Sequence, residues 1–359
     1  TDTWEFARAE SKSPAARPVD GGTLVMEQGP CVLVTRTELN GATWNAETSA
    51  WNASVSLEPG KEATFHVAFA LGGKQEALDS CAAIMSNPQE ARASARKEFG
   101  RLENELFEKL PRFSSNNESL VRLYNRSLVH FITNRWDVPE FRLHRYYSTG
   151  SIRGGCVCDY LWNFGEVWEI LPLFDPEANR EHIKQFLKID LTKHFAFLPV
   201  TGEGFGPWYP VNQEKIIGLI YFYVKNTGDL GFLDEQVEGK SVYDWVILNA
   251  MYGDDPVRAV ELIDYGPSNS HLELRRGYPY NHVMPDLNGR RYWNYLMAAQ
   301  LAEASGKPAP PLRERAAELK SALKERLWNP ELKWFHFLNE KGEKDSRLTV
   351  QMFKLFGSG

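Results

Sequence analysis

The sequence predicts an all-β portion, expected to be part of an antiparallel sandwich, followed by a larger all-α domain. Three observations predict this order. Hydrophobic residues alternate with a period of two in residues 1–86, and they recur at helical spacing from about residue 87 onward. The loops between the helical segments differ widely in length. With 359 residues, the chain is long enough for two domains with substantial cores.

The β portion is predicted from short alternating segments separated by Gly and Pro. Residues 23–27 (TLVME) and 31–37 (CVLVTRT) are two candidate strands. Residues 55–73 contain a Pro-Gly turn followed by large hydrophobic residues that share one face of a strand. These residues are Phe65, Val67, Phe69 and Leu71. The strands are few for a complete sandwich, so we expect a partial one at 1–86.

The helical part begins with a predicted helical linker at 87–111, which Asn87 and Pro88 start as a cap and first-turn pair. The next helix is predicted within 114–136, where Ser115 and Glu118 form a capping-box pattern. Its apolar stripe consists of Leu120, Leu123, Tyr124, Leu128, Phe131 and Ile132.

Further helices are predicted along the rest of the chain. Residues 159–174 and 215–224 are apolar on nearly every side, which is typical of helices in the interior of a large domain. Asp175 and Pro176 start another amphipathic segment that ends near residue 191. The remaining predicted helices are 241–251, 286–306 and 311–328.

Two long loops, 199–213 and 263–285, are rich in aromatic residues and glycine. They alternate with short turns such as NTGD (226–229) and EASGKP (303–308). In architectures built from paired helices, this asymmetry indicates that one end carries short connections and the other end carries the functional loops.

Several motifs occur in an order that resembles the (α/α)6-toroid, or six-hairpin, glycosidases, in particular the trehalases, processing α-glucosidase I and the glycogen-debranching-like enzymes. The motifs are DYLWNFGEVWEILPLFDPEANREHIKQFL, PWYPVNQEKIIGLIYFYVKNTGDLGFL, SHLELRRGYPYNHVMPDLNGRRYWNYLMAAQLAEASG and LWNPELKWFHFLN. Trp162 and Asn163 stand where these families usually have Trp-Asp. The resemblance implies a toroid domain at 112–359, and a β-sandwich is common before such a toroid.

The resemblance also implies that the toroid is incomplete in this chain. About seven helices are predicted from periodicity, fewer than the twelve of a complete toroid. The catalytic base of these families lies in the last helical hairpins, beyond the part that this sequence matches. We therefore expect either a fragment of a longer protein or a toroid that a separate chain completes.

Inverting glycoside hydrolysis needs one protonated carboxyl and one carboxylate that activates water. Glu273 lies between two leucines, and the resemblance places it near the general acid of these families. An apolar setting raises the pKa of a carboxyl, as a general acid requires. A salt bridge with Arg275 or Arg276 is the alternative for Glu273, and it would lower the pKa instead.

Other residues are candidates for binding the sugar. Arg275, Tyr278, Tyr280 and His282 could donate hydrogen bonds to hydroxyl groups. Trp208 and Tyr209 could stack on a sugar ring or anchor their loop in the core. Asp159, Trp162, Asn163, Gln213 and Asn288 complete the candidate set, each with a structural alternative as a cap, core or helix-start residue. Among rival acids, Asp286 is predicted to be a helix N-cap and Asp264 a turn residue.

Composition excludes several classes of protein. The net charge is −6 without a long basic run, which argues against nucleic-acid binding. No apolar stretch reaches the roughly 20 residues of a membrane span, and residues 1–18 lack the apolar core of a signal peptide. The spacing of Cys31, Cys81, Cys156 and Cys158 favours buried free thiols over a metal site. Aromatic residues form 13% of the chain, which fits either a sugar-binding cleft or a core rich in Trp.

The sequence therefore predicts an inverting glycoside hydrolase that acts on an α-linked sugar without a cofactor. A lyase on the same scaffold, or a carbohydrate-binding or scaffolding protein without a complete catalytic pair, remain alternatives. An oligosaccharide or glycoside is the expected partner. Self-association or a complementing chain is also expected, because an open toroid exposes apolar helix faces. The compartment stays open, with a periplasmic or secreted location favoured over the cytoplasm.

Overall fold

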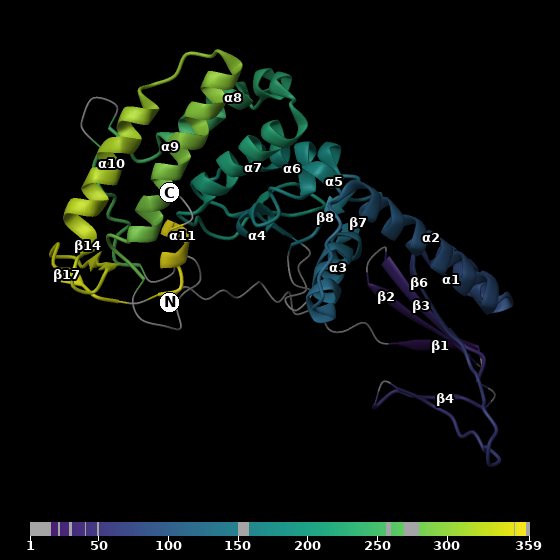
Figure 1. The fold of residues 1–359 in the computed structure, drawn as a ribbon. Helices are drawn as coiled ribbons and strands as arrows, with labels where there is room; N and C mark the ends of the chain where they lie inside the picture. The colour runs from purple at the N-terminus through teal and green to yellow at the C-terminus, as the bar shows by residue number, and fades with distance from the viewer. Residues whose placement is uncertain are drawn as a thin grey trace. The chain divides into compact units, whose positions relative to one another are not determined.

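The computed structural model describes residues 16–20, 22–28, 31–39, 41–48, 50–149, 158–255, 260–268, 280–347 and 349–356. The chain divides into two compact units, Thr1–Glu105 and Leu106–Gly359 (Figure 1). The first unit contains a small antiparallel sheet and the second is largely helical. The predicted order of a sheet region followed by a helical domain is confirmed.

The first unit is built on a four-stranded antiparallel sheet with the order β1-β2-β3-β6. Its strands are β1 (Arg17–Asp20), β2 (Thr23–Gln28), β3 (Cys31–Thr37) and β6 (Val67–Gly72). A separate two-stranded pair consists of β4 (Thr43–Asn45) and β5 (Ala50–Asn52). Two helices follow, α1 (Lys74–Ser86) and α2 (Pro88–Lys109), and α2 occupies the predicted linker.

Helix α1 covers one face of this sheet. Val34, Ala68 and Cys81 belong to the buried cluster between them. The opposite face carries the large residues of the 55–73 segment, and Phe69 and Leu71 are 64% and 73% exposed. These residues share one side as predicted, but α1 packs on the other side, where alanine allows the helix to approach closely.

Helix α3 (Glu118–Thr133) opens the helical part of the second unit. Its N-cap is Asn117, whose side chain accepts hydrogen bonds from the backbone N–H groups of Ser119 and Leu120. The predicted capping box of Ser115 and Glu118 is therefore wrong. Ser115 instead accepts a hydrogen bond from the backbone of Asn117, and Glu118 is the first helical residue.

The second unit continues through a series of helices joined by loops and short strand pairs. The helices are α4 (Leu161–Gly165), α5 (Leu171–Phe174), α6 (Pro176–Lys188), α7 (Asn212–Thr227), η2 (Leu230–Asp234), α8 (Val242–Ala250), α9 (Pro285–Ser305), α10 (Leu312–Leu327) and α11 (Met352–Phe356). The short strands are β7 (Arg135–Trp136), β8 (Tyr146–Tyr147), β9 (Asp159–Tyr160), β10 (Ala196–Phe197), β11 (Gly204–Phe205), β12 (Gln236–Val237), β13 (Lys240–Ser241), β14 (Trp328–Asn329), β15 (Trp334–Phe335), β16 (Phe337–Leu338) and β17 (Lys344–Asp345).

The predicted continuous helix at 159–174 is broken in the structure. It consists of strand β9, the short helix α4, a turn and the short helix α5. Gly165 ends α4 against the Lys215 side chain, where a Cβ atom would lie 2.4 Å from Cδ of the lysine. Pro172 lies in the first turn of α5, where its missing N–H costs no helical hydrogen bond.

Contacts between the helices establish their relative directions. Glu214 of α7 pairs with Arg290 of α9, and Tyr221, two turns further along α7, donates to Gln300 of α9 at 2.6 Å. From the first contact to the second, the residue number increases along both helices, so α7 and α9 run parallel. In contrast, Arg313 at the start of α10 pairs with Glu303 at the end of α9, so these two helices run antiparallel.

Contacts also fix the direction of the segment that contains α4, and the lengths of the loops distinguish the two ends of the domain. Gly165 and Trp168 pack on Lys215 and Gly218, so the segment that contains α4 is parallel to α7. The loops that lead into the N-terminal ends of α7 and α9 are the long ones, and the α9–α10 connection is short. The N-terminal turns of these parallel helices therefore lie at the end of the domain that carries the long loops.

The described helices include none that is both long enough and apolar enough to cross a membrane.

Candidate functional site

One fully buried carboxyl at the long-loop end belongs to Asp286. It occupies the second position of α9 after Pro285 and is 0% exposed, and the N-cap residue is Met284. The predicted N-cap role of Asp286 is therefore wrong. Burial raises the pKa of Asp286 from 3.8 to about 6, although a hydrogen bond from Tyr280 and contacts with the backbone N–H groups of Asp286 and Leu287 oppose this rise.

Tyr280 donates a short hydrogen bond to Oδ2 of Asp286. Within the described part of the chain, Oδ1 of Asp286 is buried and has no hydrogen-bond partner. Unsatisfied buried polar atoms are rare in native proteins, so this oxygen is a candidate contact for another group. Among the described side chains, Tyr280 thus holds one oxygen of this carboxyl and none holds the other.

Three half-buried aromatic rings gather near this carboxyl. The Trp208 ring centroid lies 6.0 Å from that of Tyr252 and 6.5 Å from that of Tyr265. Tyr265 interacts electrostatically with Asp286 and Tyr280, so the rings and the carboxyl belong to one neighbourhood. Two different long loops contribute to this aromatic cluster, defined as Trp208, Tyr252 and Tyr265.

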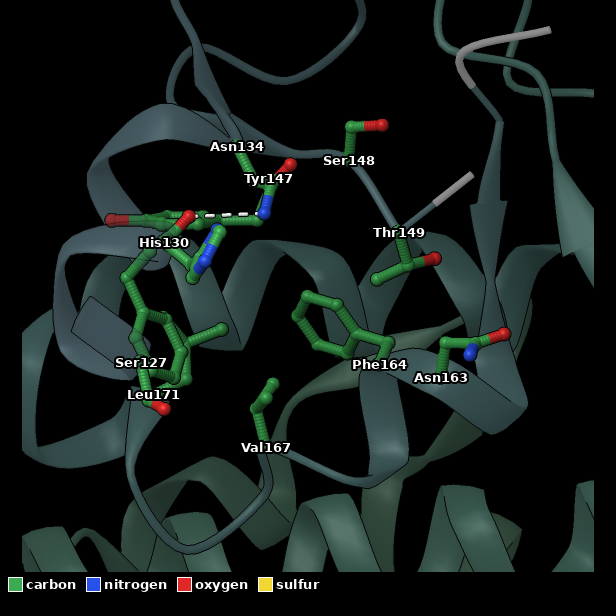
Figure 2. Close-up of a pocket in the computed structure, with 11 residues that line it drawn as sticks. Ser127, His130, Asn134, Tyr147, Ser148, Thr149, Asn163, Phe164, Val167 and Leu171 are labelled. Atoms are coloured by element: carbon green, nitrogen blue, oxygen red, sulfur yellow. Dashed lines mark hydrogen bonds between the residues drawn. The ribbon is translucent and has the colours of Figure 1, made fainter. Parts of the chain in front are cut away.

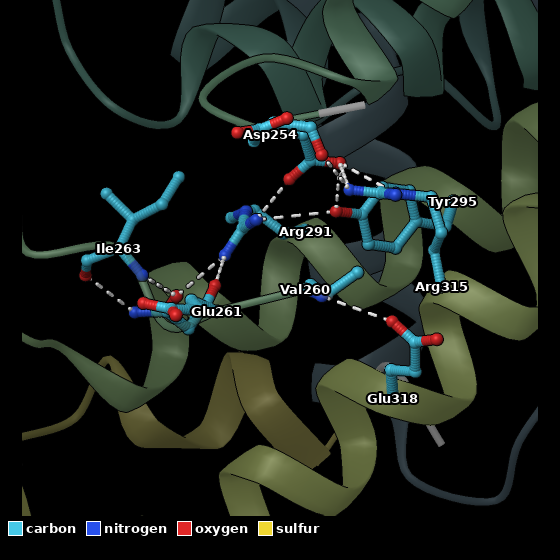
Figure 3. A network of polar contacts seen from close by, with 10 residues as sticks. Asp254, Val260, Glu261, Ile263, Arg291, Tyr295, Arg315 and Glu318 are labelled. Atoms are coloured by element: carbon cyan, nitrogen blue, oxygen red, sulfur yellow. Dashed lines mark hydrogen bonds and ion pairs between the residues drawn. The ribbon is translucent and has the colours of Figure 1, made fainter. Parts of the chain in front are cut away.

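A buried polar network holds the loop that carries Tyr252 and Tyr265 (Figure 3). The Asp254 carboxylate accepts hydrogen bonds from Arg291 at 2.5 Å, Tyr295 at 2.6 Å and Arg315 at 3.2 Å. Arg291 and Tyr295 lie on α9 and Arg315 lies on α10. Since two guanidinium groups share one carboxylate, this network fixes the loop to both helices.

Asn288 fixes the same loop at a second point. Its Oδ1 accepts from the backbone N–H of Ile263 at 2.8 Å, and its Nδ2 donates to the carbonyl oxygens of Ile263 and Met284, each at 3.1 Å. Asn288 therefore acts like an added strand partner for the loop. These bonds occupy the amide group that the sequence suggested as a possible sugar contact.

His282 and Asp264 tie the two stems of the long loop together. Nδ1 of His282 lies 3.1 Å and 3.2 Å from the Asp264 carboxylate oxygens. The His282 backbone also pairs with Tyr265 and Gly266. Asp264 accepts from the backbone of Gly266 at 2.7 Å, as expected for a turn residue. His282 has a positive φ of 58°, which places it in a sharp bend.

Buried polar side chains also occupy the N-terminal turn of α7. Gln213 is 4% exposed, and neither atom of its amide group has a hydrogen-bond partner among the described residues. Glu214 next to it pairs with Arg290, whose pKa burial lowers to about 10. Lys215 pairs with Glu166 at 2.9 Å and lies over the Trp168 ring. Charged contacts thus connect the three parallel helical segments.

Tyr209 has a structural environment that differs from that of Trp208. Its buried ring stacks on Phe195 with centroids 4.8 Å apart, and Phe195 stacks on Tyr160 at 5.0 Å. This three-ring stack joins the loop before α4 to the loop before α7. The geometry favours the anchoring alternative for Tyr209, while Trp208 reaches the aromatic cluster.

Asp159 forms a second buried acidic site, in strand β9. It is 0% exposed, and burial raises its pKa well above the ordinary value. Thr149 donates to its Oδ1 at 3.0 Å, and Nε2 of His182 lies 3.5 Å from its Oδ2. Burial lowers the pKa of His182 to about 4, so the imidazole is neutral at pH 7. Asp159 does not cap helix α4, because the N-cap residue of α4 is Tyr160.

A cavity of about 260 Å³ lies between α3 and α4, beside the Asp159 site (Figure 2). Thr149 and Asn163 contribute polar groups to its wall, while Phe164, Val167 and Leu171 contribute apolar groups. Asn163 is exposed on the surface of α4, and the neighbouring Trp162 is half-buried. The substrate-binding candidates are thus divided between this cavity and the neighbourhood of Asp286.

Glu273, Arg275 and Tyr278 lie outside the described residues. Among the other candidates, Tyr280 contacts Asp286 directly, whereas Trp208 and His282 contact Tyr265, which interacts electrostatically with Asp286. Asp159, Trp162 and Asn163 lie instead in or next to α4, on the side of the cavity between α3 and α4. Tyr252 and Tyr265 were missed in the sequence, where nothing distinguishes them from core aromatics.

The chain matches no protein-family model and no curated protein. Among solved structures, it is similar to a rhamnosidase from Klebsiella oxytoca with rhamnose bound, with 12% identity, a TM-score of 0.46, and coverage of 69% of this chain and 48% of the other. A putative kojibiose phosphorylase from the human microbiome is similar with 13% identity and a TM-score of 0.47. The match covers 90% of this chain and 48% of the phosphorylase. An α-mannosidase from Bacteroides thetaiotaomicron is similar with 11% identity and a TM-score of 0.40. The match covers 93% of this chain and 47% of the mannosidase. The chain spans about half the length of each structure.

Proposed function

We propose that this protein cleaves an α-glycosidic bond with inversion at the anomeric carbon, as part of an (α/α) toroid glycosidase. The observation that carries the proposal is the buried Asp286 carboxyl, whose pKa is raised to about 6 and whose Oδ1 has no partner among the described residues. A glycosidase needs a carboxyl that can donate a proton at the pH where the enzyme works, and a pKa of about 6 leaves Asp286 substantially protonated at mildly acidic pH.

The aromatic cluster supports a sugar as the substrate. Trp208, Tyr252 and Tyr265 present half-buried rings near Asp286. Aromatic faces pack well against the C–H faces of pyranose rings, and neighbouring polar groups then select the hydroxyl arrangement. The proposed substrate is therefore a glycoside with a pyranose ring at this cluster.

In the proposed reaction, a protonated carboxyl donates its proton to the glycosidic oxygen as the bond between that oxygen and the anomeric carbon breaks. A water molecule attacks the anomeric carbon from the opposite face and gives its proton to a carboxylate base. The leaving sugar departs as an alcohol, and the first carboxyl is left ionised until it regains a proton. We expect the base in the later hairpins of the toroid, as the family resemblance implies.

Two carboxyls are candidates for the proton donor. Glu273 is proposed from the sequence, and Asp286 meets the same physical requirement in the described residues. Variants Glu273→Gln and Asp286→Asn separate them, because each change removes the proton donor and keeps the size of the side chain. The donor's variant should lose about 100-fold or more in kcat on an unactivated glycoside, since general acid catalysis contributes roughly that factor.

The decisive assay follows the product anomers by NMR on a panel of α-linked disaccharides. Inversion predicts that the β-anomer appears first and the α-anomer forms later by mutarotation. Retention of the α-anomer would contradict the mechanism. Saturable sugar binding without turnover by the whole protein would instead support the carbohydrate-binding alternative.

We also propose that the helical unit associates with another copy or with a complementing chain. Leu120 and Leu123 of α3 are 48% and 61% exposed, although they belong to the predicted apolar stripe of that helix. Exposed apolar helix faces favour association, because covering them removes apolar surface from water.

A further inference from the structure

The two carboxyl oxygens of Asp286 differ in their hydrogen bonding, because Tyr280 binds one of them. The Tyr280 hydroxyl donates to Oδ2, and Oδ1 has no hydrogen-bond partner in the described part of the chain. Both side chains are almost completely buried. The Tyr280 ring also packs edge-on against Phe337, with centroids 6.1 Å apart, so its orientation is fixed from the other side.

Charged groups on the described part of α9 are already paired. Arg290 of α9 pairs with Glu214 of α7, and Arg291 pairs with Asp254. Tyr265 contributes a phenol to the neighbourhood, and its pKa is raised by burial. Arg347 lies over the Phe337 ring, with its guanidinium carbon 4.7 Å from the ring centroid. Among the described side chains, Tyr280 thus donates to the Asp286 carboxyl.

We infer that Tyr280 is the positioning residue of Asp286: its hydroxyl holds Oδ2 and leaves Oδ1 as the oxygen that meets the substrate. This inference rests on the proposed function for the identity of the substrate, but the pairing itself does not. It also revises the sequence-based role of Tyr280, since a hydroxyl bound to a carboxylate is not available for a sugar hydroxyl.

A hydrogen bond to a carboxylate stabilises its charged form. Tyr280→Phe removes this bond, so the Asp286 carboxyl should hold its proton to higher pH. The expected shift is upward by about one pH unit, because hydrogen bonds to charged groups contribute roughly that much. The matched control is Tyr223→Phe, since Tyr223 donates to Asp229 at 2.9 Å near the opposite end of α7.

The measurement is a pH titration of protein labelled with ¹³C at the aspartate carboxyls, in which the resonance absent from Asp286→Asn identifies Asp286. Tyr280→Phe should raise the midpoint of this resonance, and Tyr223→Phe should leave it unchanged. An unchanged midpoint in Tyr280→Phe, or an equal shift in both variants, would overturn the inference. If Tyr280→Phe does not fold, the Tyr280 ring resonances of the unaltered protein should titrate with the midpoint of Asp286, and a lack of response would overturn it.

Activity separates this inference from the proposed function. In an active enzyme, the alkaline limb of the kcat/KM profile should move upward in Tyr280→Phe by the same amount as the carboxyl titration. A shifted carboxyl titration in a protein that cleaves no glycoside would support the pairing and refute the proposed function. A shifted titration with an unchanged activity profile would refute the positioning role.

Discussion

Replacing Asp286 by Asn should stabilise the folded protein at neutral pH. The pKa of this carboxyl is raised from 3.8 to about 6 by burial, so the folded state binds the proton more tightly than the unfolded state. Stability therefore falls as pH rises from about 4 to about 6 and is then constant. A difference of about two pKa units between the folded and unfolded states corresponds to about 3 kcal/mol of unfolding free energy. Asn avoids this loss of stability because it does not ionise.

Denaturant unfolding of the helical unit, followed by circular dichroism at about pH 4 and about pH 7.5, measures this effect. The difference in unfolding free energy between Asp286→Asn and the unaltered protein should grow by about 3 kcal/mol between these pH values. The control is Asp190→Asn. The pKa of Asp190 is lowered to about 2, chiefly by a hydrogen bond from Thr192, so its contribution should not change within this range. A constant difference for Asp286→Asn would refute the reasoning.

Three further outcomes follow from the structure. Asp254→Asn should lower the unfolding free energy by about 3 kcal/mol or more, because it leaves the buried Arg291 and Arg315 without their carboxylate, and denaturant unfolding checks this. Trp208→Ala should raise KM about tenfold with a smaller effect on kcat if its ring stacks on the substrate, as steady-state kinetics would show; an unchanged KM would exclude stacking. Light scattering should show concentration-dependent association of the purified chain that Leu123→Gln weakens, whereas a monomer at all concentrations would contradict the proposed interface.

The helices could be predicted because their periodicity is local. Asp175 caps α6 as its position before Pro176 indicated, and the apolar run at 215–224 is the buried helix α7. The break between α4 and α5 could not be predicted from hydrophobicity, since it depends on the approach of Lys215 to Gly165. Likewise, alternation showed which residues of β6 share a face, but the position of α1 decided which face is buried.

The candidate site was harder to predict because its properties arise from contacts between distant segments. Asp286 precedes an apolar run, which suggested an N-cap. Pro285 was the missed signal, because proline favours the first helical position and so places Asp286 inside the helix. The aromatic cluster joins residues separated by more than forty positions, and no short pattern in the sequence predicts such a meeting.

A crystal structure of the whole protein with a non-hydrolysable α-linked disaccharide tests the central claim most directly. We predict a pyranose ring against Trp208, Tyr252 and Tyr265, with the linking atom within hydrogen-bond distance of Asp286 Oδ1. A sugar bound in the cavity beside Asn163 instead, with Oδ1 of Asp286 occupied by the protein itself, would contradict it.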